Sequence, residues 1–166
     1  MIELSKLSPD YEVRHLTEAD ADEILTLMRG NPQFYRYCGR QNTREELLDD
    51  LRLTPPGVEL FRKFYVGFYD SRGLAAVLDL IDGYPGEKDA YLGFFMLRMD
   101  LQGRGLGTRI VQELFRYLGS EGYTMARLGI DKGNPQSTHF WKKNGFVVTR
   151  EVERDGGVLL AAERPL

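Results

Sequence analysis

The chain has 166 residues, a mass of 19.0 kDa and a formal net charge of −3 at pH 7, which fits one domain over residues 1–166. This slightly acidic balance excludes the general basic field that binding nucleic acid in bulk requires. Cys38 is the only cysteine, so no internal disulfide or cysteine metal cluster can form, and without a signal peptide or a long apolar run we expect a cytoplasmic protein that does not engage a membrane.

The first half of the chain shows strand and helix patterns in turn. Two helices are expected there, each opened by a capping box, at Thr17–Asp20 and at Thr43–Glu46, and each with apolar residues on one face. Gly30-Asn-Pro32 is expected to end the first helix, and the second stops before Pro55. The strands expected in this half are Tyr11–Leu16, Phe61–Tyr69, Leu74–Ile81 and Ala90–Arg98.

A glycine run follows the last of these strands and opens an amphipathic helix that we expect to reach Ser120. Gly103, Gly105 and Gly107 can turn successive N–H groups toward one point, where the helix presents its unpaired donors and its positive dipole end. Such a junction suits an anion, and a diphosphate fits it. The run is neither the dinucleotide fingerprint nor a P-loop, because its spacing is Gly-x-Gly-x-Gly and no Lys-Ser/Thr pair follows.

The last part of the chain contains one more strand and helix and then two strands. Met125–Ile130 is predicted to be a strand, and Asn134-Pro135 is typical of an N-cap followed by a proline in the first helical turn. That helix is expected to end at Asn144-Gly145, and the final strands are Phe146–Glu153 and Val158–Arg164. The predicted order is therefore βααβββαβαββ, a mixed sheet with helices on both faces.

Two motifs in this half resemble those of one enzyme family. Gln102-x-x-Gly105-x-Gly107 resembles the acyl-CoA pyrophosphate loop of the GNAT superfamily of N-acetyltransferases, which reads Gln/Arg-x-x-Gly-x-Gly/Ala. Asn134-Pro-Gln-Ser-Thr-His-Phe-Trp-Lys-Lys-Asn-Gly-Phe146 resembles the family's next motif, in which an Asn opens a helix that ends in an aromatic residue, polar residues and Gly-Phe. The resemblance spans Ala90–Val152 in detail. It implies a GNAT-like α/β fold with a mixed, mostly antiparallel sheet of about seven strands.

The resemblance also implies acetyl-CoA as the co-substrate and no metal. Its pantetheine arm would lie where Ala90–Arg98 and Met125–Ile130 splay apart, paired with the backbones of Phe95 and Leu97. Asn134 can instead serve as a helix cap alone, and Arg104 and Lys143 can be merely solvated. The cofactor-binding residues expected are Phe95, Met96, Leu97, Gln102, Gly103, Arg104, Gly105, Leu106, Gly107, Thr108, Asn134, Trp141 and Lys143.

The catalytic positions depart from the better-known pattern of the family. A glutamate base is often found at the position of Tyr91, and the usual general acid is a tyrosine at the position of Trp141, whose indole N–H does not give up a proton near neutral pH. Asp79 interrupts an apolar strand, where burial would raise its pKa and suit it to accept a proton. Asp89 lies on the same strand face as Tyr91. The catalytic candidates are Asp79, Asp89 and Tyr91, and the hairpin register decides whether Asp79 faces the same way.

The predicted acceptor is a primary amine on a small cationic molecule. The resemblance implies that the acceptor site is shaped by the segment around Phe34–Tyr37, the hairpin from Asp79 to Asp89 and the turn at Arg154-Asp155. The acids expected to favour a cation are Asp79, Asp82, Glu87 and Asp89, although such acids are also ordinary turn residues. The alternatives are a protein or N-terminal acetyltransferase, a catalytically silent acyl-CoA-binding module and a nucleotide-binding α/β module. The expected assembly is a monomer or a homodimer.

Overall fold

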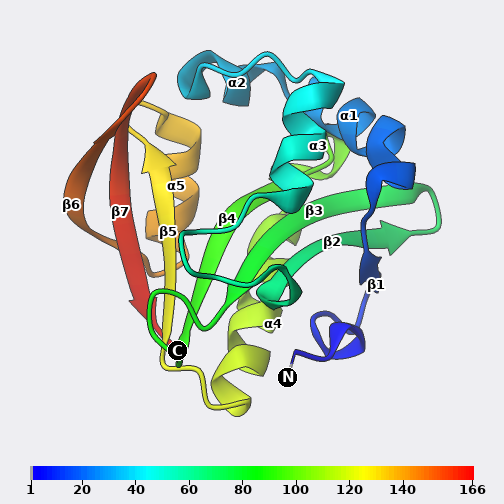
Figure 1. Ribbon diagram of the computed structural model, residues 1–166. Helices are drawn as coiled ribbons and strands as arrows, with labels where there is room; N and C mark the ends of the chain where they lie inside the picture. The colour runs from blue at the N-terminus through cyan, green and yellow to red at the C-terminus, as the bar shows by residue number, and fades with distance from the viewer. Residues whose placement is uncertain (1) are drawn as a thin grey trace.

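The computed structural model describes residues 2–166 and contains one seven-stranded sheet in the order β1-β2-β3-β4-β5-β7-β6 (Figure 1). The strands are β1 (Glu12–His15), β2 (Lys63–Asp70), β3 (Gly73–Asp82), β4 (Asp89–Leu97), β5 (Met125–Asp131), β6 (Val147–Arg154) and β7 (Gly157–Pro165). The α-helices are α1 (Ala21–Arg29), α2 (Pro32–Cys38), α3 (Arg44–Arg52), α4 (Leu106–Ser120) and α5 (Pro135–Lys143). Short 3-10 helices cover Leu4–Lys6, Glu18–Asp20, Leu60–Arg62 and Met99–Leu101.

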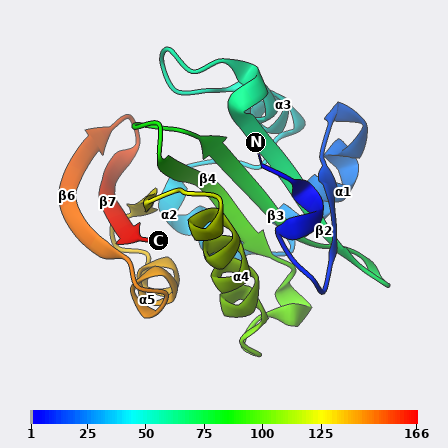
Figure 2. The same ribbon diagram turned by 90° about the horizontal axis from the view of Figure 1, so that it is seen from below.

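The sheet is antiparallel except between β4 and β5. These two strands run parallel because α4 connects them, and its 15 residues supply the crossover that a parallel pair needs. Helices cover both faces of the sheet (Figure 2). Buried side chains of α1 and α3 pack on one face against Val77 and Met96, while α4 packs on the other against residues such as Leu78 and Leu92. The crossover therefore places the N-terminus of α4 beside the end of β4.

The predicted fold class is confirmed, with one helix more than the sequence indicated. Between β1 and β2 the chain forms three helices, because α2 begins at Pro32. The proline was expected to end a helix, but at the first helical position its missing N–H costs nothing and its fixed φ suits a helix. Both predicted capping boxes are present, at Thr17 and at Thr43. Most strand boundaries differ from the predicted ones by one or two residues, as frayed ends commonly do.

No helix within residues 2–166 combines the length and the apolar character that crossing a membrane requires.

Candidate functional site

The parallel strands β4 and β5 separate half-way along their length. They pair from Asp89 opposite Met125 to Leu92 opposite Leu128, and β4 then continues to Leu97 without β5 beside it. The register between β3 and β4 shifts at the same level, since Asp79 lies opposite Phe94 while Leu80 lies opposite Leu92. Gly93 is thus an extra residue in β4, and such a bulge bends a strand and ends regular pairing. The result is a gap lined by backbone groups that no strand occupies.

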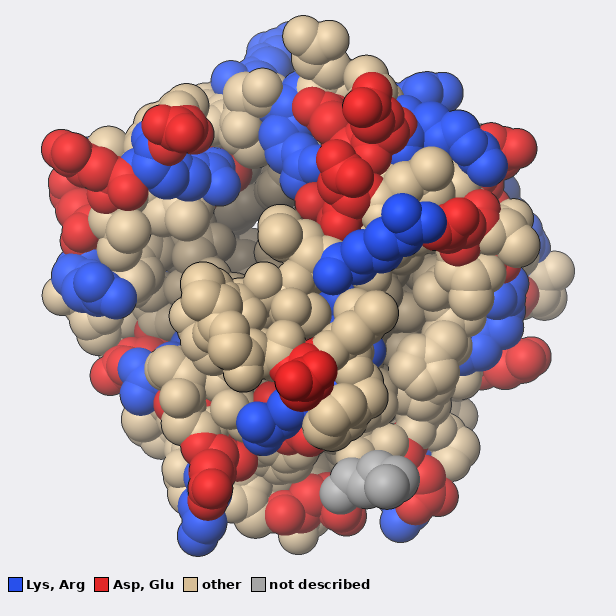
Figure 3. All heavy atoms as spheres, viewed as in Figure 1, with Lys and Arg blue, Asp and Glu red and all other residues tan. Residues whose placement is uncertain are grey.

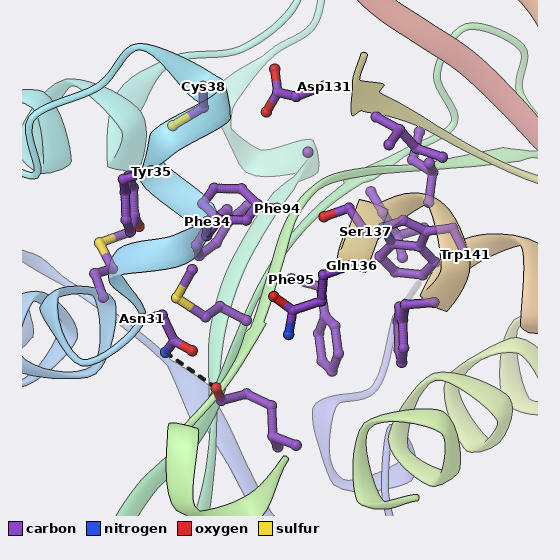
Figure 4. A pocket seen from close by; sticks show the side chains of 18 of the residues that line it. Asn31, Phe34, Tyr35, Cys38, Phe94, Phe95, Asp131, Gln136, Ser137 and Trp141 are labelled. Atoms are coloured by element: carbon purple, nitrogen blue, oxygen red, sulfur yellow. Dashed lines mark hydrogen bonds between the residues drawn. The ribbon is translucent and has the colours of Figure 1, made fainter. Parts of the chain in front are cut away.

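A cleft of about 480 Å³ opens at this gap, within the usual size range of small-molecule sites. Figure 3 shows it as a hollow, with acidic side chains gathered beside it over α3. In Figure 4 the labelled side chains converge on it from α2 on one side and from α5 on the other, with β4 between. We call the part lined by Gln102, Gly103, Gly105, Gly107, Thr108 and Lys143 the loop side. The part lined by Phe34, Tyr35, Cys38, Arg40 and Asp50 is the α2 side.

The glycine run forms the loop side as a left-handed turn into α4. Gly103 and Gly105 have φ of 74° and 77°, and Gly105 is the N-cap of the helix. A methyl group added at either residue would meet no atom within 4 Å, so the loop backbone faces open space. At Gly107, by contrast, a methyl carbon would lie 3.3 Å from the ring of Phe140, so this glycine lets α4 and α5 approach each other. The first-turn N–H groups of α4 have no partner within the helix.

Gln102 anchors this loop to the end of β4. Its Nε2 donates to the carbonyl oxygen of Leu97 over 2.8 Å and to Oδ1 of Asn31 over 2.5 Å. Asn31 is 5% exposed and donates in turn to Leu97 O over 3.3 Å. Gln136 of α5 donates to Gln102 Oε1 over 3.2 Å. The Gln102 side chain is therefore occupied with protein partners that hold the loop against the strand.

Helix α5 places two aromatic side chains beside the gap. Asn134 caps it, accepting from the backbone N–H of Ser137 over 3.1 Å, as predicted. Trp141 is 8% exposed, lines the cleft and packs between Phe140 and Phe146, with ring centroids 4.8 and 5.3 Å away. Phe95 stacks on Phe140 at 6.0 Å. These rings form an apolar wall without a titratable proton.

The three candidate catalytic residues occupy different environments. Tyr91 lines the cleft, and burial raises the pKa of its hydroxyl. Asp79 does not line the cleft but lies directly behind Gly93, where its Oδ2 accepts from Lys63 Nζ over 2.7 Å. Burial raises the pKa of Asp79, and Lys63 counteracts part of that rise. Asp89 lies outside the cleft, and its Oδ2 accepts from Arg127 Nε over 2.8 Å.

The acids expected to face the acceptor are held elsewhere. Asp82 accepts from the hydroxyl of Tyr123 over 2.6 Å, and Glu87 is exposed outside the cleft. The carboxylates that line the cleft are instead Glu46, Asp50 and Asp131, of which Asp50 pairs with Arg40 over 2.7 Å and Asp131 pairs with Arg154. Burial raises the pKa of the Asp50 and Asp131 carboxyl groups. Arginines thus neutralise two of these three carboxylates.

A roof bridges the α2 side of the cleft. Gly39, after α2, lies next to the turn between β6 and β7, so that a methyl group on it would be 4.0 Å from Gly156 O. Arg154, just before that turn, lines the cleft and pairs with Asp131 at the end of β5. Figure 1 shows α2 and the β6–β7 turn meeting above β5. Two segments far apart in the sequence therefore cover one side of the cleft together.

Most of the predicted cofactor residues meet in this cleft. The predicted residues that line it are Tyr91, Phe95, Met96, Leu97, Gln102, Gly103, Gly105, Gly107, Thr108, Trp141 and Lys143. Arg104, Leu106 and Asn134 lie beside it without lining it. The sequence did not single out Asn31, for which the only indication is its position at the end of a predicted helix. Nor did it single out Gln136, which lies within the second motif, or Asp131. The only indication for Asp131 is its position at the end of a predicted strand, where polar residues often lie at a sheet edge.

Comparison with known proteins agrees with this architecture. The model of the acetyltransferase (GNAT) family matches residues 31–146. A crystal structure of an acetyltransferase from Thermus thermophilus is 26% identical, with a TM-score of 0.72 over 93% of this chain and 96% of that one. The PaiA N-acetyltransferase from Thermoplasma acidophilum, solved with coenzyme A, is 18% identical, with a TM-score of 0.65 over 93% and 98%.

A curated relative is holothin acyltransferase from Pseudoalteromonas sp. (strain SANK 73390), 30% identical over 95 residues. That match covers 57% of this chain and only 29% of the relative. The family model, by contrast, spans both sequence motifs, the splayed strands and the glycine loop. The chain therefore belongs to the acetyltransferase (GNAT) family.

Proposed function

We propose that this protein is an N-acyltransferase that moves an acetyl group from acetyl-CoA to a small primary amine. The observation that carries the proposal is the end of β4–β5 pairing at Leu92 and Leu128, in the same cleft as the glycine loop of α4. The unpaired strand edge suits an extended chain with amide groups, and the helix N-terminus suits a diphosphate. Acyl-CoA carries both chemical features in one molecule.

The loop side fits the phosphate end of such a molecule. The open space over Gly103 and Gly105 lets phosphate oxygens reach the backbone N–H groups of residues 103–108. Lys143 lines the same side and supplies a positive charge, to which Arg104 adds from the loop. The PaiA structure, which was solved with coenzyme A, has the same fold. Gln102 serves as an anchor of the loop, since its amide is already bonded to Leu97 and Asn31.

The α2 side fits a small acceptor better than a polypeptide. A protein acceptor needs an open groove for an extended segment, whereas the roof at Gly39 and Gly156 covers this part of the cleft. Phe34, Tyr35 and Tyr91 line the covered space and can pack the carbon skeleton of an amine. The roof is the observation that favours a small molecule over a protein N-terminus.

Acyl transfer requires a neutral amine, a thioester held close to it and a proton for the leaving sulfur. Positioning supplies much of the rate enhancement, and a backbone N–H at the β4 bulge can stabilise the oxyanion. Tyr91 lines the cleft, and its hydroxyl lies next to Gly129, 3.6 Å from where a methyl carbon on that glycine would be. We assign Tyr91 the role of proton donor to the leaving sulfur. Trp141 forms part of the apolar wall.

A catalytically silent acyl-CoA-binding module is the second candidate. Trp141 favours it, because this residue occupies the helix position where the family usually carries a titratable tyrosine. The two candidates differ in one respect, which is whether an amine speeds the release of free CoA thiol. Both predict binding of acetyl-CoA.

The test is release of free thiol from acetyl-CoA with a panel of small primary amines, polyamines and amino acids, and with short peptides of free N-terminus. Acyl transfer predicts amine-dependent release, with a product heavier by one acetyl group in mass spectrometry. The roof predicts that small amines exceed peptides by more than about tenfold in kcat/KM, since a covered cleft excludes a chain. Binding without amine-dependent release identifies the silent module.

A further inference from the structure

Gly93 forms a window between the cleft and the carboxylate of Asp79. It is exposed, it lines the cleft and it is the extra residue of the β4 bulge. A methyl carbon at position 93 would lie 2.6 Å from Asp79 Oδ2, closer than real Cβ atoms come to any neighbour. Any other residue would therefore cover or displace the carboxylate. The missing side chain leaves Asp79 Oδ2 behind a gap in the cleft wall.

Asp79 is held in place by a buried partner. Lys63 Nζ donates to its Oδ2 over 2.7 Å, and the two side chains are 3% and 13% exposed for Lys63 and Asp79 respectively. Asp79 Oδ1 is buried and has no hydrogen-bond partner among residues 2–166. A buried carboxylate needs a counter-charge, which Lys63 supplies with one hydrogen bond to Oδ2, while the second lone pair of Oδ2 retains capacity to accept a proton on the side of Gly93. The titratable groups around it are Lys63 and Tyr65 of β2, Asp50 of α3 and Tyr91 of β4.

Three other carboxylates of the region are each bound by an arginine, whereas Glu46 accepts from the backbone N–H groups of Gln41 and Thr43. Asp50 pairs with Arg40, Asp131 with Arg154 and Asp89 with Arg127. An arginine is always protonated and fixes its partner as a carboxylate through several donors. Asp79 differs from these aspartates in having a lysine as its partner and a buried oxygen, Oδ1, without a hydrogen-bond partner among the described residues.

We propose that Asp79 accepts a proton from the acceptor's ammonium group through the window at Gly93, with Lys63 as its positioning residue. This inference rests on the proposed function. The acceptor is accordingly an amine that enters as an ammonium ion and is neutralised within the cleft. Burial raises the pKa of Asp79, which brings its proton affinity closer to that of an amine.

In the proposed reaction Asp79 carries one proton, taken from the ammonium group, while the acetyl group is transferred. The ammonium gives that proton to the carboxylate, and the nitrogen lone pair then forms the N–C bond to the thioester carbon. The C–S bond breaks, and sulfur leaves with its electron pair. Tyr91 donates its proton to the sulfur, which becomes the free thiol, and takes the second proton from the nitrogen. Asp79 returns its proton to solvent.

The test compares wild-type enzyme with the double variant Asp79→Asn/Lys63→Gln. The single change Asp79→Asn leaves a buried lysine uncompensated and endangers folding, whereas the double variant keeps a neutral hydrogen-bonding pair. We expect kcat/KM for the amine to fall about 100-fold. The thermal stabilisation by acetyl-CoA should stay unchanged, which shows that fold and cofactor site survive.

The pH profile separates a catalytic from a structural role. The carboxylate must be ionised to accept a proton, so wild-type kcat/KM rises as pH rises through the pKa of Asp79. The double variant should lose this rise, which is the acidic limb of the pH profile. Lys63→Gln alone keeps the base but removes its cation, so its limb should move to higher pH. Gly93→Ala should lower kcat while acetyl-CoA still binds.

Two amines of different pKa identify the source of the limb. A limb that stays in place with both amines belongs to the enzyme, as we expect, and one that moves with the amine overturns the inference. Full activity of the double variant also overturns it, while the proposed function stands. If wild-type enzyme transfers acetyl to no amine in the panel, the proposed function and this inference both fail.

Discussion

The side-chain amide of Gln102 donates to Oδ1 of Asn31 over 2.5 Å, and both residues also donate to the carbonyl oxygen of Leu97. This arrangement joins the end of α1, the end of β4 and the start of the glycine loop at one buried point. The loop's position over the cleft therefore depends on a residue that lies 71 positions away in the sequence.

Asn31→Ala should loosen the loop. It removes a hydrogen-bond acceptor and two donated bonds in a buried site, so the free energy of unfolding should fall by about 1–2 kcal/mol. The KM for acetyl-CoA should rise several-fold, because a mobile loop must be ordered on binding. Chemical denaturation and steady-state kinetics measure the two effects. An unchanged KM would show that the loop is held without Asn31.

Gly105→Asp should abolish acetyl-CoA binding while the fold survives. The substitution puts a carboxylate where phosphate must approach the backbone. Gly122→Asp is the matched control, because Gly122 also has a positive φ, 92° against 77°, and equally open surroundings. Thermal shift with millimolar acetyl-CoA should stabilise the control and leave Gly105→Asp unmoved. Equal stabilisation of both variants would place the pyrophosphate elsewhere.

Trp141→Phe should retain most turnover, because an aromatic surface still lines the cleft and no proton is lost. Trp141 packs against Phe140 and Phe146, so the smaller ring should lower the free energy of unfolding by about 1–2 kcal/mol. Trp141→Tyr should turn over at least as fast as Trp141→Phe. The measurement is the rate of thiol release by the wild type and by each of the two variants at saturating acetyl-CoA. Inactivity of a folded Trp141→Phe would mean that the indole itself takes part.

Asp20→Asn should reduce stability near neutral pH and make no difference in strong acid. Asp20 accepts from Arg14 over 2.9 Å, which lowers its pKa below the ordinary value of 3.8. Because the pKa of Asp20 is lower in the folded state, its charge stabilises the protein at pH values above the pKa of the unfolded state. That stabilisation disappears as the pH falls through the pKa of the folded state. We expect a difference of about 0.5–1 kcal/mol at pH 7 for this partly exposed pair. A difference that persists at pH 2 would contradict this origin.

The sequence predicted the elements whose signals are local. Both capping boxes, the α4 amphipathic pattern and the Asn134 cap depend on residues within one or two turns. Helix α2 was missed, because seven residues with three aromatics show no clear period and the proline suggested a boundary. The glycine loop was recognisable because its backbone conformation requires glycine at fixed positions.

The parts of the site that depend on strand register could not be predicted. The bulge at Gly93 decides that Asp79 lies behind the cleft wall, and a bulge depends on how two strands pair. Asp89 shares the strand face of Tyr91, but Arg127, 38 residues away, holds its carboxylate. The roof formed by Gly39 and Gly156 brings together segments that share no local pattern.

A crystal structure with acetyl-CoA tests the central claim most directly, namely that the gap between β4 and β5 is the acyl-transfer site. The account predicts a diphosphate against the N–H groups of residues 103–108, a pantetheine arm along Phe95 and Leu97, and a thioester carbon beside Gly93. Crystals of Gly105→Asp grown with the same ligand should lack it. A diphosphate bound away from this loop, or a thioester remote from Gly93, would contradict the account.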